Sequence, residues 1–477
     1  FPALKRGLWE HRHETPAICP ERLALLTDFE LRHPQRPTNR GARSLRQARA
    51  VHHVLLHRHA EVAPDDLLAG STTSKTVGVQ LFPELGTTAI WPELLTVQGR
   101  EVNPYRLSDA DRRVLERCLP HWTDTNIREW ARAADNDPEE LRLDERFALF
   151  FLWKNHAVSH TIADLPRVLT QGLRDRARAL RAAEARAGDP DTRDVLRAQG
   201  LALDGVMGYA ARLAARAEAR AAAATDPAAR ARLRDLAQAL RRVPASPART
   251  LLEAVQAVWI VFLALHQENM NAGLSLGRLD VWLQPYLEAD LARAETPSAR
   301  DGVIQRAVEL AGALMLKCTD HLPLVPDIGN RLFGGSSSDQ VITLGGVDAQ
   351  GRSAVCDMTW VFLKATEMLR LRDPNVNARV APGVTSDAYL RRLCELNLLT
   401  RATPSLHNDD AVVPVLQGLG FSEADARDWS ATGCVEPTSC GRHMGHTGSL
   451  MINLVAALEM ALRDGRHPRV GERAGPR

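Results

Sequence analysis

Lysine is scarce in this chain of 477 residues, since only five of its 60 basic residues are lysines. Aromatic residues make up only 5% of the chain, and the formal net charge is +2. A nearly neutral chain has no bulk electrostatic attraction for nucleic acid, so we expect no nucleic-acid partner. The arginine excess is typical of a genomic composition bias and does not by itself indicate phosphate binding.

The seven cysteines include no Cys-x-x-Cys pair and are spread from Cys19 to Cys440. This spacing excludes a small disulfide-stapled domain and favours a reducing compartment, so we expect a cytoplasmic location. The longest apolar run, residues 258–265, is too short to cross a bilayer, and no secretory leader is visible. We therefore expect no membrane attachment.

Reactive side chains concentrate between residues 428 and 448, where Cys434 and Glu436 stand just before Pro437. In an extended segment, residues two apart point the same way. We therefore expect the thiol and the carboxylate to face one cavity, while Val435 faces its wall. Because Pro437 prevents helix continuation, the segment predicts a loop tip that presents both groups together.

The next segment, residues 449–464, is apolar on nearly every helical face until Gly465 signals its end. A helix that is apolar all round is normally buried. We therefore expect the loop to hang from an interior helix.

A cysteine beside an acid is compatible with several roles. An ionic nucleophile needs a cationic neighbour to lower its pKa, and a carboxylate does the reverse. Cys434, Cys440, His443 and His446 could be four metal ligands, but their spacing is loose and we predict no metal site. A radical carrier and an inert buried thiol remain as alternatives.

The run Gly-Cys-Val-Glu-Pro at residues 433–437 resembles the cysteine loop of the glycyl radical enzymes, which include pyruvate formate-lyase and related dehydratases, lyases and decarboxylases. The resemblance implies that Cys434 becomes a thiyl radical, which takes a hydrogen atom from a small organic substrate. It implies that Glu436 is a general acid or base. The residues suit this chemistry, because a thiyl needs a dry site and a nearby carboxylate can move the proton that the radical step makes acidic.

Further segments match the family in order along almost the whole chain, which we treat as one catalytic domain, 1–477. Residues 18–33, 46–59 and 250–259 predict helices. The Ala- and Arg-rich residues 172–243 predict three long, solvated outer helices, and interspersed acids argue against a nucleic-acid arm. Strand, helix, strand, helix in residues 340–399 predicts an α/β sheet with crossovers. The resemblance implies a ten-stranded α/β barrel, incomplete at its C-terminal end.

His160 and Asp164 are four apart and would share a helix face, where the carboxylate can orient the imidazole. The resemblance makes His160 a substrate-contacting residue. It also gives four further substrate-binding candidates: Ser275, Asn408, His446 and Gly448. Arg278, with the nearby carboxylate of Asp280, is expected to be structural. Arg379 and His443 are expected to be structural as well, with binding of an anionic substrate group as the alternative.

Departures from the family bear on the substrate. The diol dehydratases carry a His-Ser pair where this chain has Ala272 and Gly273, and an Asp where it has Gly448. We therefore expect a roomier, less polar pocket and a bulkier substrate, such as an arylacetate that undergoes decarboxylation. The expected activity is that of a glycyl radical lyase, by decarboxylation or elimination. Diol dehydration, formate acetyltransferase-like acyl transfer and an inactive ligand-binding remnant are the alternatives.

The family stores its radical on a glycine within an Arg-Val-x-Gly-Tyr-like motif, which does not occur here, since residues 469–471 read Arg-Val-Gly. We expect that glycine on polypeptide outside this chain, either the rest of a longer enzyme or a separate subunit. The chain itself should then hold no cofactor and show no activity alone. The resemblance also implies a radical-SAM activating enzyme with an iron–sulfur cluster, and a homodimer.

Overall fold

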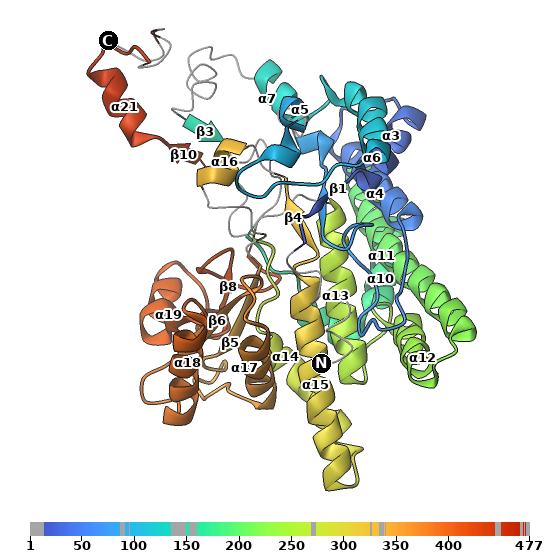
Figure 1. Ribbon diagram of the computed structural model, residues 1–477, viewed down its shortest axis with the longest axis vertical. Helices are drawn as coiled ribbons and strands as arrows, with labels where there is room; N and C mark the ends of the chain where they lie inside the picture. Colours follow the sequence, from blue (N-terminus) through green and yellow to red (C-terminus); the bar gives the residue numbers. More distant parts are fainter. Residues whose placement is uncertain are drawn as a thin grey trace.

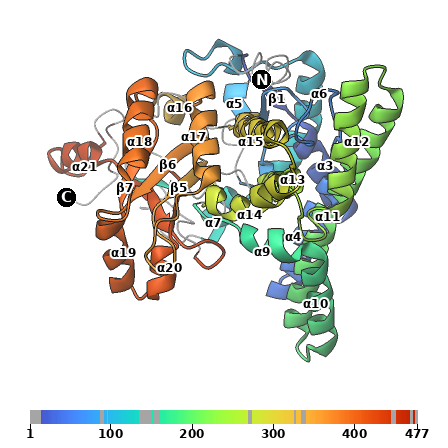
Figure 2. The same ribbon diagram turned by 90° about the horizontal axis from the view of Figure 1, so that it is seen from below.

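The computed structural model describes residues 14–85, 91–94, 96–134, 149–151, 160–268, 273–324, 327–332, 338, 340–443, 450–467, 471 and 473. A layer of long helices lies on one side, and a small parallel sheet with its own helices lies on the other (Figures 1 and 2). Central helices join the two. One continuous apolar core runs from the helical layer to this sheet.

The N-terminal part pairs two helices with a small sheet. Helices α3 (Glu21–Arg32) and α4 (Arg40–His57) confirm the two helices expected near the start, with shifted bounds. Asn39 caps α4 by accepting a hydrogen bond from the amide of Ala42. The short strands form one parallel sheet in the order β1-β2-β4, with bounds Ala17–Cys19, Gly78–Gln80 and His321–Pro323. Short helices decorate this part: α5 (Trp91–Leu94), α6 (Asp109–Cys118), α7 (Ile127–Ala134) and α16 (Asp327–Leu332).

The outer helical layer is formed by residues 172–243, for which three helices were expected. It comprises α10 (Leu173–Arg186), α11 (Pro190–Ala223) and α12 (Pro227–Arg242), on the right of Figure 1. Asp189 and Asp226 cap α11 and α12 with side-chain oxygens, and proline follows each cap. The two Asp-Pro breaks in the sequence are therefore helix starts.

The centre is built from apolar helices. These are α13 (Leu251–Glu268), α14 (Leu279–Ala292) and α15 (Pro297–Lys317). Among the described residues, α13 alone has the length and apolar composition of a membrane-crossing helix, and 78% of it is buried within the protein. Core helices share these properties, so α13 is weak evidence for a span.

A three-stranded parallel sheet supports the cysteine loop. Its order is β5-β6-β7, with bounds Val341–Gly345, Asn375–Val380 and Ser405–Asn408. Helices α17 (Asp357–Leu369) and α18 (Asp387–Thr400) provide the crossovers, which confirms the predicted α/β alternation. Ile342 and Leu344 face the main core, whereas Val341 packs with Trp429 and Ala431 beside the loop. After β7, helices α19 (Asp409–Gly418) and α20 (Glu423–Arg427) lead into the hairpin of β8 (Ser430–Thr432) and β9 (Glu436–Thr438).

The expected buried helix at residues 449–464 is wrong in both length and burial. The segment forms strand β10 (Leu450–Ile452), paired with β3 (Leu149–Phe151), and the short helix α21 (Leu454–Ala461). Leu454 and Leu458 on α21 are 75% and 60% exposed. Apolar periodicity predicts that a helix packs against other residues, but it does not show which segment they come from. The described residues do not cover this face of α21.

Candidate active site

Cys434 lies at the tip of a β-hairpin. Residues 433–435 form the turn between β8 and β9, and Thr432 pairs with Glu436 at its base. Gly433 has φ of +59°, a left-handed conformation that favours glycine. Cys434 and Glu436 are exposed, and Val435 is 49% exposed. The expectation that Val435 faces a wall is therefore wrong, because the segment turns instead of staying extended. Within the described residues, the tip is also not enclosed.

The Glu436 carboxylate folds back beneath this turn. Its Oε2 atom accepts hydrogen bonds from the backbone amides of Cys434 and Val435, at 2.9 and 2.8 Å. Its Oε1 atom lies 3.6 Å from Nε2 of His160. The structure thus brings together three residues selected from the sequence, Cys434, Glu436 and His160, with the carboxylate bonded to the backbone amide of Cys434.

His160 does not lie on a helix with Asp164, which corrects that prediction. Its φ is +50°, and the chain continues into a parallel bridge between Ile162 and Ser275. Asp164 instead caps helix α9 (Leu165–Gln171) by accepting from the amide of Arg167. An Asp four residues after a His is equally suited to start the next helix, and this role prevails here.

Two glycines accommodate the His160 ring. A β-carbon on Gly433 would lie 2.2 Å from Cδ2 of His160, and one on Gly273 would lie 3.0 Å from Cε1. Extra room for substrate was expected at Gly273 from the sequence. The imidazole occupies that room, so Gly273 by itself gives no argument for a bulky substrate.

Ser275 supports the hairpin. Its Oγ donates to the carbonyl of Gly273 and accepts from the amide of Val341, both at 3.2 Å, and lies 3.2 Å from Oγ1 of Thr432. A hydroxyl offers one donor and two acceptor sites, so these three protein groups use its capacity. This arrangement favours a structural role for Ser275 over substrate binding.

The remaining substrate-binding candidates are less informative. Asn408 ends β7 and caps α19 by accepting from the amide of Asp410. His446 and Gly448 lie outside the described residues. Among the residues that the structure does describe, no group of three or more His, Cys, Asp or Glu side chains is placed to hold a metal ion. Of the four conceivable ligands, His443 contacts Oγ1 of Thr438 at 2.8 Å.

The sequence analysis missed three residues that hold the cysteine. Asn375 and Asn377 on β6 each donate a side-chain amide hydrogen to the carbonyl oxygen of Cys434, at 3.0 and 3.2 Å. His407 on β7 contacts Oδ1 of Asn377 through Nε2. The Asn-Val-Asn spacing within a predicted strand was the available signal, because it puts both amides on one face.

A buried ion pair anchors the chain that enters the hairpin. Arg379 and Asp409 form a bidentate pair at 2.8 and 2.9 Å, with side chains 0% and 3% exposed. Arg379 also donates to the carbonyls of Arg427 and Trp429. Burial lowers the pKa of Arg379 to about 10, and Arg278 contributes. The expectation of a structural Arg379 agrees with this geometry.

Arg278 is fixed by a different carboxylate from the one expected. It pairs with Asp428 at 2.8 Å and donates to the carbonyl of Gly345. Asp280 instead accepts from the amide of Gly345 and the hydroxyl of Thr359, and burial raises its pKa. Sequence proximity suggested the wrong partner, because Asp428 is distant in sequence.

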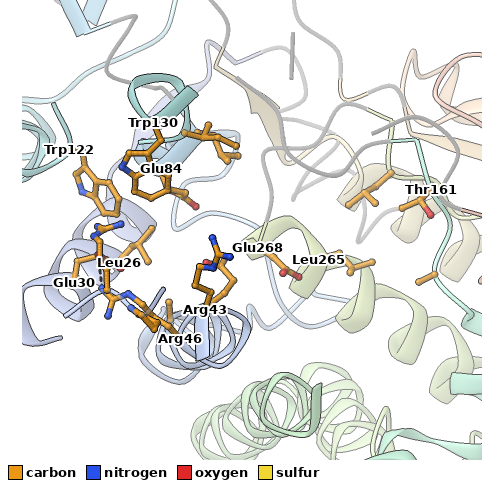
Figure 3. A pocket seen from close by; sticks show the side chains of 18 residues that line it. Leu26, Glu30, Arg43, Arg46, Glu84, Trp122, Trp130, Thr161, Leu265 and Glu268 are labelled. Atoms are coloured by element: carbon orange, nitrogen blue, oxygen red, sulfur yellow. Dashed lines mark hydrogen bonds and ion pairs between the residues drawn. The ribbon is translucent and has the colours of Figure 1, made fainter. Parts of the chain in front are cut away.

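A cavity of about 650 Å³ extends to Thr161 and Leu274, the chain neighbours of His160 and Ser275. Figure 3 shows Trp122 and Trp130 on one side and Thr161 and Leu265 on the other. Neither Cys434 nor Glu436 lines it. We place the candidate site at the hairpin, where reactive groups converge, because cavity size alone carries no chemistry.

Comparison with known proteins identifies the family. A family model described as pyruvate formate lyase-like matches residues 6–477. The chain belongs to this family. Among relatives, isethionate sulfite-lyase of Oleidesulfovibrio alaskensis is 29% identical over 476 residues, which cover 96% of this chain and 56% of the relative. (2S)-3-sulfopropanediol dehydratase of Klebsiella oxytoca is 26% identical over 96% of this chain and 55% of its own length.

Solved structures of glycyl radical enzymes share the fold of this pyruvate formate lyase-like chain. A Roseburia inulinivorans structure described under 1,2-propanediol dehydration superposes with a TM-score of 0.90 at 28% identity, over 99% of this chain and 58% of that one. A glycyl radical enzyme from Archaeoglobus fulgidus gives a TM-score of 0.87 at 28% identity, over 98% and 60%. The α/β barrel class is thereby confirmed. The chain spans somewhat more than half the length of the relatives it matches.

Proposed function

We propose that this chain carries the hydrogen-abstracting cysteine of a glycyl radical lyase, with Cys434 as the thiyl residue. The observation that carries the proposal is the convergence of Cys434, Glu436 and His160 at one hairpin tip. Cys434 is exposed at that tip, so a radical-bearing segment from other polypeptide has access to this residue. The radical on that segment supplies the unpaired electron. This chain supplies the sulfur and the proton-transfer groups.

The chemistry begins when the Cys434 thiyl takes a hydrogen atom from a substrate carbon. If that carbon bears a hydroxyl, the hydroxyl becomes acidic. Glu436 can accept its proton while the neighbouring leaving group departs. The product radical then recovers a hydrogen atom from the Cys434 thiol, which restores the thiyl. The hydrogen atom that the thiyl takes is returned to the product, so the steps need no further oxidant or reductant.

His160 is positioned to work with Glu436. Its Nε2 atom lies 3.6 Å from Oε1 of the carboxylate, a separation that shortens readily on binding. We assign His160 to orientation of the carboxylate and to contact with the substrate. Asn408, His446 and Gly448 stay in the proposal as substrate contacts, and Ser275 becomes a support for the hairpin.

The proposed substrate is a small organic molecule that loses a leaving group next to a hydroxylated carbon. The names of similar proteins, a sulfite-lyase and a dehydratase, support elimination. Decarboxylation is the second candidate, because indoleacetate decarboxylase of Tractidigestivibacter scatoligenes is 28% identical over half of this chain. The activase, the homodimer and the cytoplasmic location belong to the same proposal.

The test is reconstitution without oxygen. The chain is combined with the C-terminal part of a related enzyme, or expressed as the full natural protein, together with a radical-SAM activase. A glycyl doublet in the electron paramagnetic resonance spectrum establishes activation. Turnover of hydroxylated sulfonates, diols and arylacetates then sorts elimination from decarboxylation by product. Retention of turnover in Cys434→Ser would overturn the proposal, and Glu436→Gln is expected to keep the doublet but lose turnover.

A further inference from the structure

The backbone of Cys434 is held from both sides by side chains. Its amide donates to Glu436, and its carbonyl accepts from the side-chain amides of Asn375 and Asn377. Two donors on one carbonyl use both of its lone pairs. With its amide and carbonyl fixed, the direction of the sulfur depends mainly on one side-chain torsion.

The network also fixes the orientation of each polar group. Nδ2 of Asn377 must face the Cys434 carbonyl, because the reverse orientation would put two acceptors together. Oδ1 of Asn377 therefore faces Nε2 of His407, which must be the donor of that contact. The carbonyl of Cys434 thus determines the orientation of the Asn377 side-chain amide. That orientation in turn determines the tautomer of His407.

The surroundings of His407 suit this donor role. The ring lies edge-on to Trp429, with 5.4 Å between the two ring centroids. Arg379 and Asp409 are its charged neighbours. Burial and the nearby Arg379 lower the pKa of His407, so the ring is neutral near pH 7. Protonation at lower pH would keep Nε2–H as a donor. The contact therefore acts as a fixed support and not as a pH switch.

We propose that Asn375 and Asn377 are positioning residues that set the direction of the Cys434 sulfur, and that His407 holds Asn377 in the required orientation. This inference rests on the proposed function, because a fixed sulfur direction matters only if Cys434 is the hydrogen-abstracting residue. Hydrogen transfer demands close, aligned approach, and misplacement of the reacting group reduces the rate strongly. None of the three residues needs to touch the substrate.

The first test measures the turn itself and needs no activated enzyme. Hydrogen exchange at the Cys434 and Val435 amides, resolved by fragmentation mass spectrometry, reports opening of the turn. Asn377→Leu removes the amide at similar size, and exchange at both positions should rise about fivefold, as expected for one lost hydrogen bond. His407→Phe should act in the same direction, whereas His407→Gln, which restores a donor, should stay within about twofold of the parent.

Asn397 provides the matched control. Its side-chain amide donates to the carbonyl of Pro404 at 3.0 Å in the same sheet region without touching the hairpin. Asn397→Leu should leave exchange at the turn unchanged. Unchanged exchange in Asn377→Leu would overturn the inference. So would a rise that spreads equally through α18, because that pattern indicates general destabilisation.

The second test uses the reconstituted, activated enzyme. Asn377→Leu should lower kcat about tenfold or more with KM changed less than about twofold, since alignment is lost and binding is not. If Cys434→Ser abolishes turnover and Asn377→Leu leaves kcat unchanged, only the positioning role fails. If Cys434→Ser keeps turnover, the proposed function itself fails.

Discussion

Gly433 and His160 are packed so closely that a side chain at position 433 has no room beside the imidazole. A β-carbon on Gly433 would come within 2.2 Å of the imidazole and 2.8 Å of Oε2 of Glu436. The left-handed backbone of Gly433 and its missing side chain are thus both needed, one for the turn and one for the two polar groups beside it.

Gly433→Ala should therefore abolish turnover of the reconstituted enzyme, with a loss of about 100-fold or more in kcat, because His160 and Glu436 must both shift. Gly383→Ala is the matched control: Gly383 has φ of +75° but nothing within 4 Å of an added β-carbon. Both variants should lose about 1–2 kcal/mol of stability from the strained backbone. Equal activity in the two variants would contradict the close packing.

Asp409→Asn should destabilise the chain by about 3–5 kcal/mol, because it leaves the buried guanidinium of Arg379 without its counter-charge. Denaturant unfolding measures this loss. Asp175→Asn breaks the pair with Arg178, whose side chains are 66% and 72% exposed, and should cost less than about 1 kcal/mol. A similar loss in both variants would show that burial does not govern the pair.

Thiol alkylation should separate the cysteines by environment. Burial raises the pKa of Cys356 to about 11 and of Cys440 to about 12, so thiol predominates at pH 8. The reagent should modify the exposed Cys394 and Cys434 and spare the other two. Because the thiolate fraction grows about tenfold per pH unit below the pKa, modification of Cys440 should keep accelerating through pH 10. Rapid modification of Cys440 at pH 8 would contradict its burial.

The apolar face of α21 should make the isolated chain self-associate. Leu454 and Leu458 are largely exposed on one short helix, and adjoining apolar side chains at Val455 and Leu462 are 67% and 77% exposed. A double change of Leu454 and Leu458 to Ser should lower concentration-dependent light scattering and binding of an apolar dye. Leu31→Ser, at a 63% exposed position on α3, should leave both signals unchanged. Equal light scattering and dye binding in these variants would argue against α21 as the surface of self-association.

Local sequence patterns predicted many of the helices and strands. Asp-Pro breaks and Ala-rich periodicity located α10, α11 and α12, and alternating strand and helix patterns located β5 to α18. These features depend on residues close in sequence, so a single chain suffices to see them. The Gly-Cys-Val-Glu-Pro run likewise identified the hairpin tip and its two reactive groups.

Two of the failures involve partners that are distant in sequence. Arg278 was assigned to Asp280, two residues away, but binds Asp428. The amides of Asn375 and Asn377 reach Cys434 across nearly 60 residues. Spacing rules describe neighbours on one helix or strand, and they contain no information on which two elements will be adjacent after folding.

The double anchoring of Cys434 separates two tasks that a radical enzyme must accomplish. Asn375, Asn377 and Glu436 shape the reactive turn with groups from this polypeptide alone. Within the described residues the tip stays exposed, so its shelter from dioxygen and solvent is a separate task. The geometry of the turn can therefore stay fixed while its cover is changed, so a different covering polypeptide grafted over this hairpin is a route to altered substrate range.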